Sequence, residues 1–244
     1  MKHSPFYLQH SPSLSGQCYI LDKIGEKPTS PWPAFSKEEF RLAIINYNNS
    51  FALGPDKLSW SYLKIILKDD NCLNIIISIA NVCIKLGYWP LHFKRSTMIV
   101  ISKLNKKSYD SPKVFRPIVL LNTVGKLIKK VIGERLQFNT ASNEFIHPSQ
   151  LSGLKFKFTV DAGVALTHII HTSWIKNLST STLAFDIAQF FSSLNHCLLS
   201  FIMRKAGFDN RIVSFFANYL MDRKINYFWN NFMSPVFNVN VGVG

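Results

Sequence analysis

The sequence is short of acidic residues. Its 244 residues include 14 Asp and Glu against 28 Lys and Arg, which leaves a formal charge of +14. An excess of this size favours a polyanion or an anionic membrane as the partner, although a basic protein without either partner stays open. No two acids are adjacent anywhere after Asp70. The later part of the chain therefore offers no pair of carboxylates that are sequence neighbours.

Long apolar runs are also missing. One long stretch without a charged side chain, 187–203, contains Gln189, Asn195 and His196, so it does not predict a membrane span. The first residues have neither the apolar run of a secretory signal nor the pattern of an amphipathic transit peptide. We therefore expect an intracellular chain with no membrane partner.

Cysteine is scarce. Cys18, Cys72, Cys83 and Cys197 show no CxxC or other metal-type spacing, and three of them lie in apolar helical patterns. This predicts reduced and buried thiols.

Two histidines, at positions 168 and 171, are one helical turn apart without a third ligand nearby. Helix packing is a better interpretation of them than a metal pair.

Apolar residues are plentiful, at 47% of the chain, which is enough for a folded core. Residues 1–34 are rich in Ser, Pro and Gly and predict a linker. The fold is expected to begin at Phe35. There Ser36 and Glu39 have the form of a capping box, and Phe35 and Phe40 occupy the positions of a hydrophobic staple, so a helix should run to about Tyr47.

Hydrophobic spacing predicts an α+β chain that is rich in helices. Further helices are expected over 60–67, 72–86, 119–136, 159–174, 196–206 and 209–220. In the helix over 159–174, Thr159 is the expected N-cap, and the residues expected to be buried are Val160, Val164, Leu166, Ile169 and Ile170. Strands are expected at 97–101, as a buried strand, and at 182–187, with a hairpin formed by 225–229 and 236–241.

Asp186 interrupts the strand-prone run 182–187. An ionised carboxylate inside an apolar strand is costly to desolvate unless a cation or a hydrogen-bond donor meets it. A metal ion such as Mg²⁺ is one answer, because Mg²⁺ binds through one or two carboxylates together with substrate phosphates. A carboxylate at a strand end, exposed or capped, is the other answer, and the run alone favours it.

The surrounding residues change that balance. The string LAFDIAQFFSSLNH, 183–196, resembles motif A of reverse transcriptases, in which an Asp ends a palm strand, an aromatic follows five residues later, and Asn-His comes next. The resemblance implies that Asp186 is catalytic and a magnesium ligand. It also implies that Phe191 lies against the sugar of the incoming nucleotide and so favours deoxynucleotides. A core aromatic is the alternative for Phe191.

A second string, KVFRPIVLLNTVGKLIKKVIGERL at 113–136, resembles the fingers segment of reverse transcriptases from retrotransposons without long terminal repeats. By that resemblance Lys103 and Arg116 contact the nucleotide triphosphate, a role that suits an ammonium and a bidentate guanidinium. A solvated surface charge is the alternative for each. Lys126 in this string is expected to bind nucleic acid. Residues 152–154 stand where the family has Gly-Phe-Arg, so Lys155 or Lys157 is expected to bind nucleic acid in place of that Arg.

Two shorter strings agree with the same family. Residues 53–64 resemble its Gly-Pro-Asp segment, and VGVG at 241–244 resembles the opening of motif B. The resemblance thus runs over about 35–244 and implies a right-hand polymerase fold. Fingers would occupy 35–158, and a partial palm with motif A and the start of motif B would occupy 159–244, without the thumb or the end of the palm.

The family copies an RNA template from a DNA primer with deoxynucleoside triphosphates and Mg²⁺. The aromatic-x-Asp-Asp hairpin that supplies the other metal ligands is missing here, so we expect a fragment of such an enzyme that is inactive alone. A non-catalytic, basic RNA-binding remnant is the alternative. A helical interaction module would explain the helices but neither Asp186 nor the Arg-Pro-Ile string.

Overall fold

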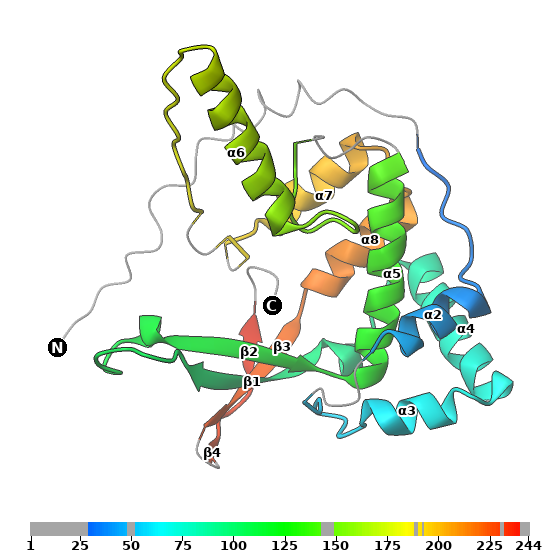
Figure 1. Cartoon of the computed structure of the whole chain (residues 1–244). Coiled ribbons are helices and arrows are strands. Elements are labelled where there is room, and N and C mark those ends of the chain that lie inside the picture. Colours follow the sequence, from blue (N-terminus) through cyan, green and yellow to red (C-terminus); the bar gives the residue numbers. More distant parts are fainter. Residues whose placement is uncertain are drawn as a thin grey trace.

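The helices and strands form an α+β structure in which helices predominate, as expected. The computed structural model describes residues 29–47, 52–142, 149–187, 190–191, 193–229 and 232–239. Its elements are α2 (Lys37–Ile45), α3 (Trp60–Ile66), α4 (Asp70–Leu86), β1 (Arg95–Ser102), β2 (Phe115–Leu121), α5 (Thr123–Ser142), α6 (Thr159–Ile175), α7 (His196–Lys205), α8 (Asn210–Leu220), β3 (Arg223–Trp229), β4 (Phe232–Met233) and β5 (Phe237–Val239). Helices α2 to α5 and α8 gather at one end of the sheet, and the β1–β2 hairpin extends away from them (Figure 1).

Local signals at the helix ends explain why these helices form where they do. Helix α2 begins with the expected capping box, in which the Ser36 hydroxyl accepts from the Glu39 amide and the Glu39 carboxylate accepts from the Ser36 amide. The expected staple is present too, because the rings of Phe35 and Phe40 meet edge to face at 6.0 Å. Helix α4 ends at Gly87, whose φ of 60° is the left-handed cap that glycine adopts without strain.

The helices share one core. Side chains that are almost fully buried come from five helices and include Phe40, Trp60, Leu73, Leu127 and Ile212. At about 25 cal/mol for each Å² of apolar surface removed from water, burial of such side chains is the main favourable term in the folding of this half of the molecule.

Arg135 on α5 fastens the first described residues to this core. Its guanidinium donates to the Glu39 carboxylate and to the carbonyl oxygens of Pro33 and Ala34, and it lies 4.2 Å from the centre of the Phe35 ring. Trp32, three residues before the expected start of the fold, is already 95% buried, with 5% of its surface exposed. The rest of the expected linker, 1–28, lies outside the described residues.

The described strands form a single sheet in the order β2-β1-β3-β4, with β5 also paired to β3. Strands β1 and β2 are antiparallel, and β1 and β3 are parallel. The prediction of strand β1 is confirmed. The prediction that this strand is buried is wrong, because most of its residues are half-buried or exposed. The expected hairpin is confirmed as the antiparallel pair β3 and β5.

Strand β2 was not expected. Residues 119–121 were assigned to the start of a helix, but they pair with 96–98 of β1, and the helix begins only at Thr123. The run Val-Leu-Leu fits a strand as well as a helix, and backbone pairing with β1 decides between the two.

The expected helix over 159–174 is present as α6, but the expected burial is wrong. None of its residues is buried; Val164 is 63% exposed and Trp174 is 61% exposed. Phe158, not Thr159, is the N-cap residue. Most of helix α6 extends away from the sheet and from the other described helices in Figure 1, which agrees with the exposure of its apolar side chains. Its length and composition do not amount to a membrane span, and the same holds for every other described helix.

The strand expected at 182–187 is wrong as well. These residues are irregular and exposed, and Leu183 and Phe185 are 76% and 86% exposed. A strand needs a neighbour to satisfy its backbone amides and carbonyls. The described strands pair with one another, and none of them pairs with 182–187.

The cysteines divide by environment. Cys83 is buried in α4, and burial raises the pKa of its thiol to about 11, which keeps it protonated and unreactive. Cys72 is half-buried and also free, whereas Cys197 is exposed at the start of α7, so the expectation of burial fails for that residue. Cys18 lies outside the described residues.

The Gly-Pro-Asp segment closes the junction between β2 and α5. A Cβ atom on Gly54 would lie 2.1 Å from the carbonyl oxygen of Leu121, so no other residue fits there. Two residues later, the Asp56 carboxylate accepts a hydrogen bond of 2.6 Å from the backbone amide of Thr123 and so caps the start of α5. The segment therefore holds the end of the hairpin against the helical core.

We predict that Gly54→Ala lowers the free energy of unfolding by about 1–3 kcal/mol or more, because the new methyl group must displace backbone. Urea unfolding followed by circular dichroism measures this change. Gly133→Ala is the matched control: nothing lies within 4 Å of its added Cβ, and the change in an α5 interior position should be neutral or stabilise the chain by up to about 1 kcal/mol. Equal effects of the two substitutions would contradict the packing described for Gly54.

Candidate nucleotide and nucleic-acid site

The register of the β1–β2 hairpin brings Lys103 and Arg116 together. Arg116 is directly opposite Ile101, and the Lys103 amide donates to the Val114 carbonyl at 2.8 Å just beyond the last strand pair. Side chains two apart on a strand lie on the same face, so Lys103 is the diagonal neighbour of Arg116. Two cations separated by 13 positions in the sequence thus share one face of the sheet.

A shallow hollow of about 600 Å³ lies over this face. Its lining residues are Ile101, Ser102, Lys103, Leu104, Lys106, Arg116 and Ile118. Arg116 and Lys106 are exposed and Lys103 is half-exposed, so three cationic side chains reach the hollow. No acid lines it. A polyphosphate suits such a surface, because the guanidinium can bind two oxygens at once and the ammonium groups add point charges.

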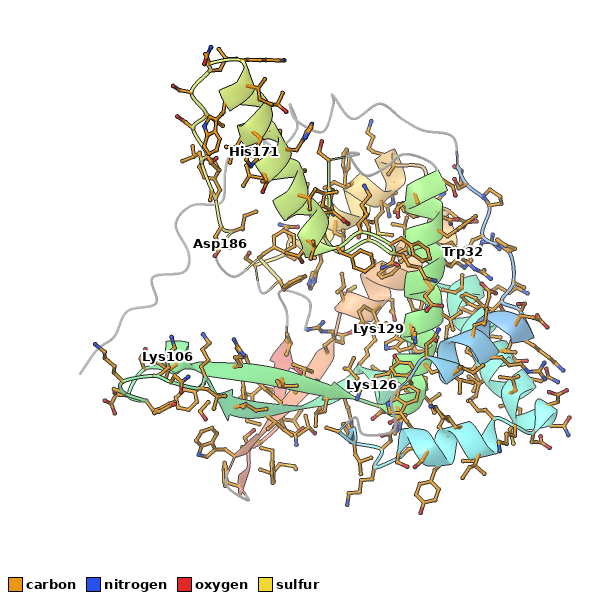
Figure 2. The ribbon with its side chains drawn as sticks, in the orientation of Figure 1. Trp32, Lys106, Lys126, Lys129, His171 and Asp186 are labelled. Carbon is orange, nitrogen blue, oxygen red and sulfur yellow. The ribbon has the colours of Figure 1, made fainter. Side chains whose placement is uncertain are left out.

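Lys106 was not among the residues expected to bind nucleotide. Lys106 belongs to the Lys-rich connection between β1 and β2. The composition of this connection shows that it is basic, but it does not show that Lys106 lines the same hollow as Arg116. Figure 2 shows Lys106 near the far end of the hairpin, well away from Lys126 and Lys129 at the lower end of α5.

Asp186 is not among the residues that line the hollow. It lies in the exposed, irregular segment that follows α6, and in Figure 2 that segment comes down from the outer end of the helix, separate from Lys106. The described residues contain no group of three His, Cys, Asp or Glu side chains that could hold a metal ion. The described surroundings of Asp186 therefore do not form a Mg²⁺ site by themselves.

Phe191 is also exposed, at 67%, and its ring meets that of Phe190 edge to face at 5.3 Å. It is not a core aromatic.

In helix α6, the ring of His171 meets the ring of Trp174 at 5.3 Å. This contact fits side-chain packing within α6 better than a metal pair.

The three lysines expected to bind nucleic acid differ in environment. Lys126 is half-buried; its amine donates to the Ala52 carbonyl at 3.5 Å, and burial lowers its pKa. Lys155 is exposed and lies 5.8 Å from the centre of the Phe156 ring. Lys157 donates to the Gln150 carbonyl at 3.1 Å. The expected motif B opening, 241–244, lies outside the described residues.

We predict that a deoxynucleoside triphosphate binds the hollow through Arg116. Arg116→Ala should weaken binding about tenfold or more, because a charged hydrogen bond contributes about 1.5–3 kcal/mol. Lys129→Ala removes the same charge from an exposed position on α5 and should change the dissociation constant by less than about twofold. Isothermal titration calorimetry with each variant measures the difference. Equal losses of affinity would mean that the net charge of the chain, and not the hollow, accounts for nucleotide binding.

Two curated proteins are similar to the chain, whereas no protein-family profile matches it. The RNA-directed DNA polymerase from mobile element jockey of Drosophila melanogaster is 28% identical over 122 residues, which are 49% of this chain and 13% of that protein. The probable RNA-directed DNA polymerase from transposon X-element of the same species is 23% identical over 214 residues, or 87% of this chain and 23% of that protein. The chain therefore spans less than a quarter of either relative. The resemblance expected from the motifs is confirmed at this level: the chain is a relative of the RNA-directed DNA polymerases of mobile elements.

Proposed function

We propose that the chain forms the nucleotide-binding fingers and the first part of the palm of a retrotransposon reverse transcriptase with a right-hand fold. Fingers occupy 35–158 and the partial palm 159–244. The observation that carries the proposal is the position of Lys103 and Arg116 at one hollow, because these two residues are far apart in the sequence and only the register of the hairpin brings them to one face. The similarity to two mobile-element polymerases supports it independently.

In this proposal the incoming deoxynucleoside triphosphate binds with its phosphates against the cationic face of the hairpin. Arg116 holds two phosphate oxygens through its planar guanidinium, and Lys103 and Lys106 add positive charge from the β1–β2 connection. Gly54 and Asp56 hold the base of the hairpin on the helical core. The hairpin thereby gives the nucleotide a rigid backing, which productive alignment with a primer end requires.

We infer that the chain alone does not synthesise DNA. Nucleotidyl transfer by two metal ions needs several carboxylates at one point, and Asp186 has no such neighbours among the described residues. Asp186 and Phe191 keep their proposed roles as the motif A acid and the residue at the nucleotide sugar, in a polypeptide that supplies the remaining palm. Mg²⁺, an RNA template and a DNA primer are partners of that longer protein in the proposal.

A non-catalytic RNA-binding remnant is the second candidate. Two observations favour it: Asp186 is exposed without partner acids in the described segment, and the chain carries a net charge of +14. Such a chain would bind RNA through counter-ion release and need no chemistry. Both candidates predict RNA binding by the chain, so activity of a longer polypeptide decides between them.

We predict that a longer polypeptide, in which an aromatic-x-Asp-Asp hairpin follows this chain, extends a DNA primer on an RNA template with Mg²⁺ and loses extension in the Asp186→Asn variant. The physical reason is the loss of one charged metal ligand from the reaction centre. Asp222→Asn is the matched control, since Asp222 is exposed at a positive φ of 54° that Asn also adopts, and it should retain activity.

Primer extension on denaturing gels is the measurement, with nucleotide affinity measured beside it. Activity that survives Asp186→Asn would remove this acid from the mechanism. A longer polypeptide that binds RNA with strong salt dependence but never extends a primer would favour the remnant. Extension by the 244-residue chain itself would contradict the inference that it is inactive alone.

A further inference from the structure

The face of the sheet that lies opposite Arg116 carries a row of aromatic side chains. Successive residues on a strand point to opposite faces, so Phe115 and Arg116 are on different faces of β2. The Phe115 ring meets Tyr109 at 6.0 Å and Trp229 at 5.5 Å. Two positions before Trp229 on the same strand, Tyr227 meets Phe237 of β5 at 5.7 Å. We call Tyr109, Phe115, Tyr227, Trp229 and Phe237 the aromatic face.

These rings are accessible although they touch one another. Tyr109, Tyr227, Trp229 and Phe237 are each 40–48% exposed. The rings come from the β1–β2 connection, β2, β3 and β5, so they extend across the width of the sheet. Figure 1 shows the helical core at the other end of the hairpin, and none of the described helices lies over this part of the sheet. The exposure thus belongs to a continuous surface.

The sheet that carries the aromatic face is strongly basic. Segments 95–121 and 223–239 contain eight Lys and Arg residues and one acid, Asp110, which gives a surplus of seven positive charges. Lys103 and Arg116, which are part of this surplus, are on the opposite face, so the cations beside the aromatic face are those of the β1–β2 connection. Among them, Lys106 and Lys107 are exposed in the same connection as Tyr109. A protein partner with an ordinary surface would gain little from such a charge, whereas a polyanion with flat apolar groups complements both properties.

We propose that the aromatic face binds single-stranded nucleic acid, with bases stacked on the rings and the backbone attracted by lysines of the β1–β2 connection. Exposed rings beside cations are how proteins hold single strands without sequence preference. A duplex offers its bases only at the edges, so the rings discriminate in favour of single strands. The site is distinct from the hollow of Lys103 and Arg116, which is on the opposite face of the same sheet, and it does not depend on polymerase chemistry.

The test uses fluorescein-labelled U12 RNA, dT12 DNA and a 12-base-pair RNA duplex, with binding followed by fluorescence anisotropy. Single strands should bind at least tenfold more tightly than the duplex. Trp229→Leu and Tyr227→Leu, which keep apolar bulk in the sheet, should each weaken U12 binding about tenfold, the loss expected for one stacked base. Trp174→Leu is the matched control and should have no effect, because Trp174 is 61% exposed and belongs to α6, a helix that Figure 1 shows away from the sheet.

Charge is tested separately. Lys107→Gln, which leaves the lining of the hollow unchanged, should reduce the slope of log affinity against log salt by about 0.7, the contribution of one phosphate contact. Arg116→Ala should weaken triphosphate binding while leaving the affinity for U12 within about threefold. Trp229→Leu and Tyr227→Leu should weaken U12 binding and leave the affinity for the triphosphate unchanged. Failure of the nucleotide site and failure of the aromatic face are therefore distinguishable.

A second measurement does not require a variant to fold. Ultraviolet cross-linking of U12 that contains 4-thiouridine to the unaltered chain should label the tryptic peptide that begins at Ile225 and the peptide 108–113, which contains Tyr109. Cross-links confined to other peptides would overturn the proposal. So would equal affinity for single strand and duplex. Self-association in sedimentation equilibrium that Trp229→Leu abolishes would also overturn it, by assigning the aromatic face to a second copy of the chain.

Discussion

The strand register between β1 and β2 is the constraint on which the functional arrangement depends. With Ser96 opposite Leu121 and Ser102 opposite Phe115, Arg116 is fixed on one face of the sheet and Phe115 on the other. A shift of one residue would exchange the two faces and would separate Arg116 from Lys103. Backbone hydrogen bonds along a ladder of seven opposed residue pairs hold the register, and the contact between Gly54 and Leu121 fixes where the hairpin meets the helices.

The sequence predicted the helical half of the molecule well, because the signals there are local. Ser36 and Glu39 are three residues apart and complete a capping box without help from distant chain, and Gly87 ends α4 by its own conformational freedom. Strand β2 could not be found in the same way. Its residues suit either a helix or a strand, and pairing with a segment some twenty residues away decides the outcome.

The candidate site was predicted in part for a similar reason. Lys103 and Arg116 were selected by resemblance, and the hairpin brings them to one hollow, but nothing local in the sequence shows that Lys106 joins them. Asp186 illustrates the opposite case. The run around it has the composition of a strand, yet its backbone has no partner among the described strands, so local propensity is not realised. Composition also marked α6 for burial, which depends entirely on what packs around it.

Helix α6 has a consequence for the behaviour of the polypeptide in a cell. An apolar helix with no buried residue, followed by exposed Leu183 and Phe185, presents the kind of surface that holdase chaperones and quality-control proteases bind. Unless another surface covers this region soon after synthesis, the lifetime of the chain would be set by competition between that covering event and degradation. The abundance of the protein would then depend more on how fast another surface covers α6 than on the free energy of unfolding of the helical core.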